Sequence, residues 1–253
     1  IFQPTFSEYA DACRMHGHRV TTLYQLPTGR NAFRLPPDIR MLWLCNPNNP
    51  TGRVEDKDYL RSLIEHNPQV CFVIDQSYEA FTLHPLFAPA EAASFPNLLL
   101  LHSLTKRYAM PGLRLGYVTA HTALLRRLRT HRMPWSVNQL AIEAGLYLLE
   151  HPQEAPMDIE AYLRETARLR KNLERLGTLK VWDTQTHFML VCLRSGKVSA
   201  LKDFLANEHG LLIRDASNFE GLDERFFRIA TQTPEENDRL VHAIAQWFEE
   251  DWQ

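Results

Sequence analysis

The sequence lacks the patterns that identify several common classes of protein. Its 253 residues contain neither G-x-G-x-x-G nor G-x-x-x-x-G-K-[ST], which excludes the standard dinucleotide site and the P-loop. The four cysteines, at positions 13, 45, 71 and 192, include no C-x-x-C pair, so their spacing predicts neither a zinc site nor a disulfide framework. His16 and His18 have no third ligand nearby, and we expect no metal.

An excess of charge of one sign and a long hydrophobic run are also missing. Lys and Arg number 28 against 30 Asp and Glu, a formal net charge of −2 that predicts no nucleic-acid partner and no acidic membrane surface. The longest aliphatic run, Leu98 to Leu101, falls far short of the ~20 residues of a bilayer helix. The first residues lack the charged and apolar regions of a signal peptide, so we expect a soluble, cytoplasmic protein.

What is present is an ordinary globular composition with alternating strand and helix patterns. Hydrophobic residues make up 45% of the chain and charged residues 23%. Apolar runs predict strands at 39–45, 70–75, 98–103 and 115–119, and an apolar stripe predicts a helix over 55–66. This alternation is typical of an α/β fold with a mainly parallel sheet and helices on both of its faces.

The second part of the chain is richer in helices. Apolar residues share one helical face over 137–148, and a longer helix is predicted from Ile159 to about Gly177. Thr233 with Glu236 forms the capping box of a last helix. Further strands are predicted at 179–182, 188–193, 211–214 and 226–230. We therefore expect a large domain over residues 1–150 and a smaller α/β domain over 151–253.

Three polar clusters follow strands of the first predicted sheet. In open α/β sheets, ligands bind beyond the carboxyl ends of the strands, so these clusters are candidate functional positions. The first, Asn-Pro-Asn-Asn-Pro-Thr-Gly at residues 46–52, forces an irregular and rigid turn. It is either a tight loop or a support that holds the amide of Asn49 over the sheet edge as a hydrogen-bond donor.

The second cluster is Asp75 with Tyr78. A carboxylate at the end of so apolar a strand is costly to desolvate unless it meets a cation or several donors. Asp75 either caps the next helix or pairs with a buried cationic nitrogen, with Tyr78 pointing into the same pocket.

The third cluster contains Ser103, Lys106 and Arg114. A lysine directly after an apolar strand can be desolvated, which lowers the pKa of its amine and makes it nucleophilic toward carbonyls. The hydroxyl and the guanidinium form a phosphate-binding pair. A lysine at a strand end is more often structural, so the functional interpretation rests on the three clusters together.

The order and spacing of the three clusters resemble those of the class I/II aminotransferases, a family of pyridoxal-phosphate enzymes. The resemblance covers essentially the whole chain and implies the aminotransferase fold. It implies that Lys106 forms a Schiff base with the cofactor aldehyde and that Asp75 pairs with the protonated pyridine nitrogen. Asn49 and Tyr78 would bond the phenolic oxygen of the ring.

The same resemblance implies further ligands. Ser103 and Arg114 would hold the cofactor phosphate, and Phe6 would stack on the cofactor ring. Arg228 matches the arginine that forks onto the substrate α-carboxylate, and Arg214 is a second anion contact.

Within the family, the sequence is most similar to histidinol-phosphate aminotransferases and threonine-phosphate decarboxylases. We expect an aminotransferase acting on a small, phosphorylated amino acid; the alternatives are the decarboxylase and a non-catalytic truncated relative. The resemblance implies a homodimer. It begins only at Pro4, without the family's N-terminal arm or the helix that cradles the cofactor phosphate, and we expect a piece of a longer chain.

Overall fold

The computed structural model describes residues 1–24, 35–154 and 156–250, and the chain forms two compact units. The first consists of Ile1–Phe2, Thr21–Pro47 and Val54–Asp158, and the second of Gln3–Val20, Asn48–Arg53 and Ile159–Gln253. Contacts thus place the main division after Asp158 and assign two short N-terminal segments to the second unit. The domain limits 1–150 and 151–253 stay a prediction.

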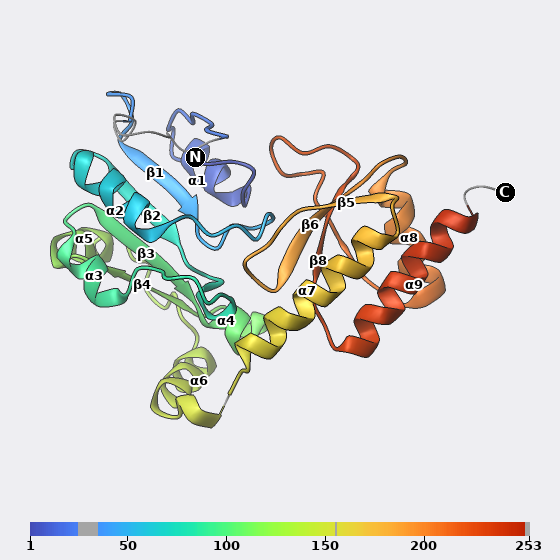
Figure 1. The fold of residues 1–253 in the computed structure, drawn as a ribbon. Coiled ribbons are helices and arrows are strands. Elements are labelled where there is room, and N and C mark those ends of the chain that lie inside the picture. Colours follow the sequence, from blue (N-terminus) through green and yellow to red (C-terminus); the bar gives the residue numbers. More distant parts are fainter. Residues whose placement is uncertain (25–34, 155, 251–253) are drawn as a thin grey trace. The chain divides into compact units, whose positions relative to one another are not determined.

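The first unit is built on a four-stranded sheet in the order β1-β2-β3-β4 (Figure 1). The strands are β1 (Met41–Cys45), β2 (Cys71–Asp75), β3 (Leu98–Ser103) and β4 (Gly116–Ala120). The β1–β2 and β2–β3 pairs are parallel, and β4 runs antiparallel to β3. All four predicted strands and the mainly parallel sheet are confirmed.

Helices cover both faces of this sheet. The helical elements are α2 (Lys57–His66), η1 (Glu79–Phe81), α3 (Pro89–Ser94), α4 (Leu104–Arg107), η2 (Pro111–Leu113), α5 (Thr122–Arg129), α6 (Gln139–Glu150) and η3 (Pro152–Glu154). Alternate strand residues such as Phe72 and Leu98 pack against α2 and α3 on one face. Val73 and Leu99 pack toward α5 on the other. Because side chains alternate along a strand, each strand contributes to both layers of the core.

The second unit combines an antiparallel sheet in the order β5-β6-β8-β7 with longer helices (Figure 1). Its elements are α1 (Glu8–Met15), α7 (Ile159–Arg175), β5 (Leu179–Val181), β6 (Phe188–Leu193), α8 (Val198–His209), β7 (Arg214–Asp215), β8 (Phe226–Ala230) and α9 (Pro234–Glu250). Met189, Val191 and Phe227 share one core with residues of α7, α8 and α9. By alternation, Leu190 and Arg228 lie on the opposite face of this sheet.

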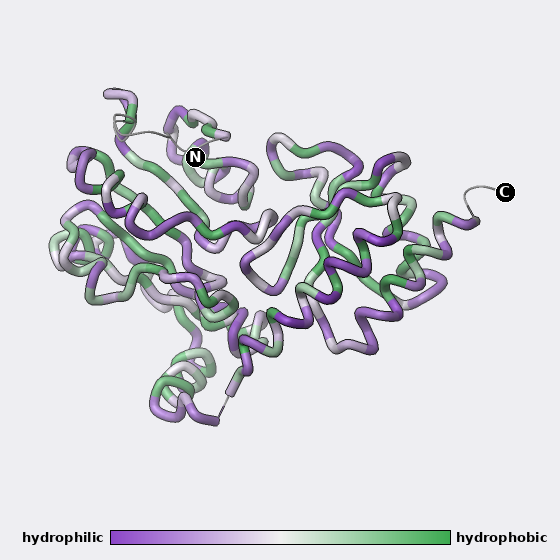
Figure 2. The backbone as a smooth tube through the Cα atoms, viewed as in Figure 1, coloured by the Kyte–Doolittle hydropathy of each residue, from purple (hydrophilic) through white to green (hydrophobic). Residues whose placement is uncertain are grey.

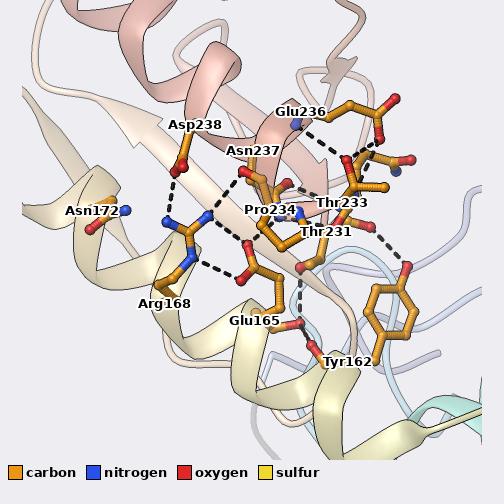
Figure 3. Close-up of polar contacts among 12 residues, drawn as sticks. Tyr162, Glu165, Arg168, Asn172, Thr231, Thr233, Pro234, Glu236, Asn237 and Asp238 are labelled. Carbon is orange, nitrogen blue, oxygen red and sulfur yellow. Dashed lines mark hydrogen bonds and ion pairs between the residues drawn. The ribbon is translucent and has the colours of Figure 1, made fainter.

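A polar network ties α7 to the start of α9 (Figure 3). Arg168 donates from Nε to Glu165 Oε2 at 2.8 Å and from Nη1 to Asp238 Oδ1 at 2.7 Å. The Arg168 hydrogen bonds hold the pKa of Glu165 below its ordinary value. The predicted capping box is confirmed, since Thr233 Oγ1 accepts from the backbone N–H of Glu236 and Thr233 N–H donates to the Glu236 carboxylate.

One predicted strand differs from the structure, and one predicted helix is present but packs differently from the expectation. The strand expected at 211–214 is wrong except for Arg214: Leu212 is 81% exposed, and pairing with β8 begins only at β7. The helix expected over 137–148 is confirmed as α6, which is hydrophobic along most of its length (Figure 2).

The packing of α6 departs from the expected apolar face. Its buried residues are Ala141 and Gly145, whereas Leu140 is 73% exposed. The helix packs through its small residues, because a Cβ at Gly145 would lie 2.6 Å from Leu115 Cδ2.

Candidate functional site

The candidate residues of the first unit gather at one edge of its sheet. Asp75 and Ser103 are the last residues of the parallel strands β2 and β3, so both stand at the carboxyl edge. Lys106 follows in α4, and Arg114 lies two residues before β4, whose first residue pairs with Ser103. The topology thus brings together four of the positions that the sequence predicted.

Asp75 and Tyr78 stand at the turn that leaves β2. Asp75 is half-buried, and its Oδ1 accepts from the backbone N–H of Ser77 at 2.8 Å. Tyr78 is 9% exposed, and Lys106 Nζ lies 5.8 Å from the centre of its ring. The aromatic ring is therefore within cation–π distance of the amine that the sequence singled out.

The expectation that Lys106 is desolvated is wrong for this structure. The apolar strand ends at Ser103, the chain turns into the four-residue helix α4, and Lys106 lies on that helix with an exposed side chain.

Ser103 and Arg114 flank a tight contact between β3 and β4. Ser103 is half-buried and pairs with Gly116, where a Cβ would lie 2.6 Å from the backbone oxygen of His102. A residue with a side chain cannot sit there without moving backbone. Arg114 is exposed, adopts a left-handed conformation with φ 57° and donates from Nη1 to the oxygen of Pro111 at 3.0 Å.

A polar cluster that the sequence analysis did not single out lies next to these residues. His102 is 4% exposed, its Nδ1 is 3.0 Å from both carboxylate oxygens of Glu79, and its Nε2 is 2.9 Å from Thr119 Oγ1. Its ring stacks on that of Tyr117 at 4.4 Å. Burial raises the pKa of Tyr117, and the charge of Glu79 adds to the effect. The available signal was a histidine at the end of a leucine run, where a buried imidazole needs partners.

In the second unit, Asn49 and Arg228 contact each other directly. Arg228 donates from Nη1 to Asn49 Oδ1 at 2.5 Å, and its guanidinium lies 5.1 Å from the centre of the Phe188 ring. Asn49 is 7% exposed. Because arginine only donates, this bond fixes the orientation of the Asn49 amide and leaves its NH₂ group as the remaining donor.

Arg228 has hydrogen-bonding capacity left over. Its Nε is buried and has no hydrogen-bond partner among the residues that the structure describes. A buried donor without a partner costs about 1–3 kcal/mol, which a bound acceptor would recover.

Arg214 stands opposite Arg228 in the β7–β8 pair. Directly opposed residues share a face of the sheet with their Cβ atoms roughly 5 Å apart, so the two like charges disfavour each other. Arg214 is exposed and donates from Nη2 to Asn218 Oδ1 at 2.9 Å. Within the described part of the chain, no carboxylate is ion-paired with either arginine. Such a pair is suited to binding anions.

The loop that carries Asn49 is held by its neighbours. Asn48 Oδ1 accepts from Thr5 Oγ1, and its Nδ2 donates to the oxygen of Pro4, both at 2.9 Å. Gly52 has φ +72°, and a Cβ there would lie 2.8 Å from the oxygen of Phe188. The segment fixed by Asn48 leads into Phe6, which is 43% exposed.

Residues 1–24, 35–154 and 156–250 hold no group of three or more His, Cys, Asp or Glu side chains placed to bind a metal ion. In the same ranges no helix has the length and apolar character needed to cross a membrane.

Comparison with known proteins identifies the family. The model of the family described as aminotransferase class I and II matches residues 1–244. Threonine-phosphate decarboxylase of Salmonella typhimurium is 32% identical over 255 residues, which span 96% of this chain and 69% of that protein.

Solved structures agree with this match. The L-threonine-O-3-phosphate decarboxylase from Porphyromonas gingivalis superposes with a TM-score of 0.92 at 38% identity, over 97% of this chain and 75% of that one. The histidinol-phosphate aminotransferase from Clostridium acetobutylicum gives a TM-score of 0.84 at 25% identity, over 98% and 76%. The chain therefore belongs to the aminotransferase class I and II family, whose cofactor is pyridoxal 5′-phosphate.

Proposed function

We propose that this protein acts at the Cα of an amino acid that carries a phosphate, and that it decarboxylates this substrate. The observation that carries the proposal is the opposed pair Arg214 and Arg228, with the unpartnered buried Nε of Arg228. Two neighbouring guanidinium groups are suited to binding a ligand that carries two anionic groups.

The residues of the first unit fit pyridoxal phosphate by their chemistry. An acid, a phenol, a hydroxyl, an amine and a guanidinium stand at one sheet edge, which matches a cofactor with a pyridine nitrogen, a phenolic oxygen, an aldehyde and a phosphate. They are Asp75, Tyr78, Ser103, Lys106 and Arg114. When bound, the cofactor supplies an aldehyde that captures the substrate amine and a ring that accepts the electron pair released at Cα.

Each side chain has a proposed task. The Asp75 carboxylate keeps the pyridine nitrogen protonated, because a nearby negative charge favours the charged form of a base. The Tyr78 hydroxyl bonds the phenolic oxygen, and Ser103 and Arg114 bind the phosphate. The Lys106 amine would hold the cofactor at its aldehyde carbon and would act as the proton carrier of the site.

In the second unit, we assign the α-carboxylate to Arg228. Its Nη1 is already oriented by Asn49 Oδ1, while Nε needs an acceptor. The remaining NH₂ of Asn49 is available for the phenolic oxygen of the cofactor. Phe6, exposed beside Tyr9, is proposed to stack on the cofactor ring.

The choice of decarboxylation rests on the two anions. Threonine phosphate bears both an α-carboxylate and a phosphate, which would occupy Arg228 and Arg214 together. Histidinol phosphate is an amino alcohol and has no carboxylate for Arg228. The similarity to threonine-phosphate decarboxylases at 32% and 38% identity supports the same choice.

Transamination is the second candidate, and it is the reaction that we expect from the sequence alone. Similarity to a histidinol-phosphate aminotransferase at 25% identity favours it. All the assigned cofactor contacts serve both reactions, which differ in whether the bond to the carboxylate or the bond to hydrogen is broken at Cα. In transamination, the Lys106 amine would take the proton from Cα.

Product analysis tests the proposal. The protein is loaded with pyridoxal phosphate and given O-phospho-L-threonine, and carbon dioxide and keto acid are both measured, with and without a keto-acid acceptor. Carbon dioxide release without an acceptor supports decarboxylation, and acceptor-dependent keto acid supports transamination. Cofactor binding with neither product would favour a non-catalytic relative. The expected homodimer is tested on the same sample by its mass in solution.

The role of Arg214 has its own control. Replacing it in Arg214→Gln should raise the KM for phosphorylated substrate about 10- to 100-fold, the range for loss of a charge-assisted hydrogen bond. Arg194→Gln removes another exposed arginine of the same unit and should leave the KM unchanged. If Arg214→Gln and Arg194→Gln change the KM equally, Arg214 does not bind the substrate phosphate.

A further inference from the structure

A polar cluster of two buried residues and one partly exposed carboxylate lies beside the proposed cofactor ligands of the first unit. It consists of Gln76, Glu79 and His102, contributed by the end of β2, by η1 and by the end of β3. Each member is next in sequence to a proposed ligand: Gln76 to Asp75, Glu79 to Tyr78, and His102 to Ser103.

The carboxylate of Glu79 is the centre of this cluster. Both of its oxygens lie 3.0 Å from His102 Nδ1, and Oε2 accepts from Gln76 Nε2 at 3.4 Å. Gln76 Nε2 also donates to the oxygen of Phe87 at 3.0 Å. Glu79 thereby joins the ends of two neighbouring strands to the turn that carries Tyr78.

The hydrogen-bond partners of His102 indicate which ring nitrogen is the donor to Glu79. Nδ1 faces only carboxylate oxygens, so it carries a hydrogen and donates to Glu79. Nε2 is 2.9 Å from Thr119 Oγ1, a hydroxyl that can either donate or accept. The imidazole side chain is 1% exposed and the Glu79 side chain 36% exposed, so the hydrogen bond is buried on the side of His102 and partly open to water on the side of Glu79.

Strand alternation places this cluster on the opposite side of the sheet from two of the ligands. His102 shares the face of Leu98 and Leu100, which pack toward α2 and α3, whereas Ser103 points to the other face. Asp75 and Gln76 likewise point to opposite faces of the sheet, with Gln76 on the face of His102. The cluster can therefore fix the backbone at the sheet edge without occupying the space of a ligand.

We infer that Glu79 and His102 are positioning residues, whose hydrogen bond sets the place of Tyr78 and Ser103 for cofactor binding. This inference rests on the proposed function, because it takes Tyr78 and Ser103 as cofactor ligands. It assigns a role in cofactor affinity to two residues that do not touch the cofactor.

Two substitutions of His102 isolate the hydrogen bond. His102→Asn places an amide nitrogen at the position of Nδ1 and keeps a donor for Glu79, while His102→Gln places one near Nε2 and keeps only the contact to Thr119. Both remove the ring that stacks on Tyr117. His102→Asn and His102→Gln therefore lose the stacking contact equally and differ only in whether the hydrogen bond to Glu79 is kept.

The first measurement is the affinity for pyridoxal phosphate, read from the visible circular dichroism of the bound cofactor. His102→Gln and Glu79→Ala should each weaken binding by about tenfold, the order expected for a lost charge-assisted hydrogen bond, and His102→Asn should bind more like the parent protein. The double variant Glu79→Ala, His102→Gln should bind no more weakly than Glu79→Ala alone, because the bond between Glu79 and His102 is already lost in that single variant.

The second measurement needs no cofactor. Amide hydrogen exchange over residues 76–81 should be faster in His102→Gln than in His102→Asn, since only the first frees η1 from β3. Equal exchange and equal cofactor affinity in the two variants would overturn the inference. If the parent protein fails to bind the cofactor, the proposed function fails, and the exchange data still decide whether His102 fixes this turn.

Discussion

Replacing Arg228 should separate substrate binding from stability in the second unit. In Arg228→Met the alkyl stem remains, while the bond from Nη1 to Asn49 Oδ1 and the contact with the Phe188 ring are lost. A hydrogen bond from a charged donor contributes about 1.5–3 kcal/mol, and the cation–π contact about 0.5–1 kcal/mol. Against them stands the buried Nε without a partner, whose removal recovers about 1–3 kcal/mol.

These opposing contributions nearly cancel, so the free energy of unfolding should change by less than about 2 kcal/mol. Binding of a carboxylate-bearing substrate should weaken about 100-fold, because a charge-assisted and potentially bidentate contact is lost. Urea denaturation measures the first quantity and titration calorimetry with O-phospho-L-threonine the second.

A matched control uses the core of the same unit. Leu201 is fully buried in α8, and Leu201→Ala should cost about 2–5 kcal/mol of unfolding free energy. If Arg228→Met is destabilised as much as Leu201→Ala, or if substrate binding is unchanged, Arg228 is a structural residue and does not bind the substrate carboxylate.

Three further predictions concern stability. The pKa of Glu91 is lowered from 4.5 to about 2 by the backbone N–H of Ala88 and by Lys57 and Arg61. The ionised Glu91 side chain therefore stabilises the folded protein fully above about pH 4.5, and this contribution is lost as the pH falls through about 2. Acid denaturation curves of Glu91→Gln should lack this contribution. Gly116→Ala should cost about 1–3 kcal/mol in a denaturant titration and also weaken cofactor binding, since its Cβ would lie 2.6 Å from the oxygen of His102; an unchanged midpoint would contradict this. Arg168→Ala should lower the thermal midpoint by an amount equivalent to about 1 kcal/mol, because Arg168 bridges Glu165 and Asp238 while it is 39% exposed; no loss would mean that the network in Figure 3 does not stabilise the fold.

The sequence predicted the elements whose burial leaves a clear pattern. Runs such as 98–103 are apolar because both faces of the central strands are covered, and the structure confirms them. The capping box of Thr233 is a local contact, and local contacts can be recognised without the fold. The strand at 211–214 was misplaced because the apolar Leu212 is exposed, and only pairing with β8 decides where β7 begins.

In the candidate site, too, the sequence predicts some features, while others depend on tertiary packing. Asp75, Ser103 and Lys106 follow strand ends, and the topology of parallel strands brings them to one edge. Lys106 is exposed because the chain turns into the short helix α4 after Ser103, and so short a helix leaves no recognisable pattern in the sequence. The bond between His102 and Glu79 joins residues 23 positions apart through tertiary packing, and no spacing rule predicts it.

Chemical labelling identifies the lysine that binds the cofactor. The protein is incubated with pyridoxal phosphate, reduced with borohydride and digested, and the modified peptide is identified by mass spectrometry. We expect a phosphopyridoxyl group on Lys106 and none in Lys106→Ala. Labelling of a different lysine, or equal labelling of the Lys106→Ala protein, would contradict it.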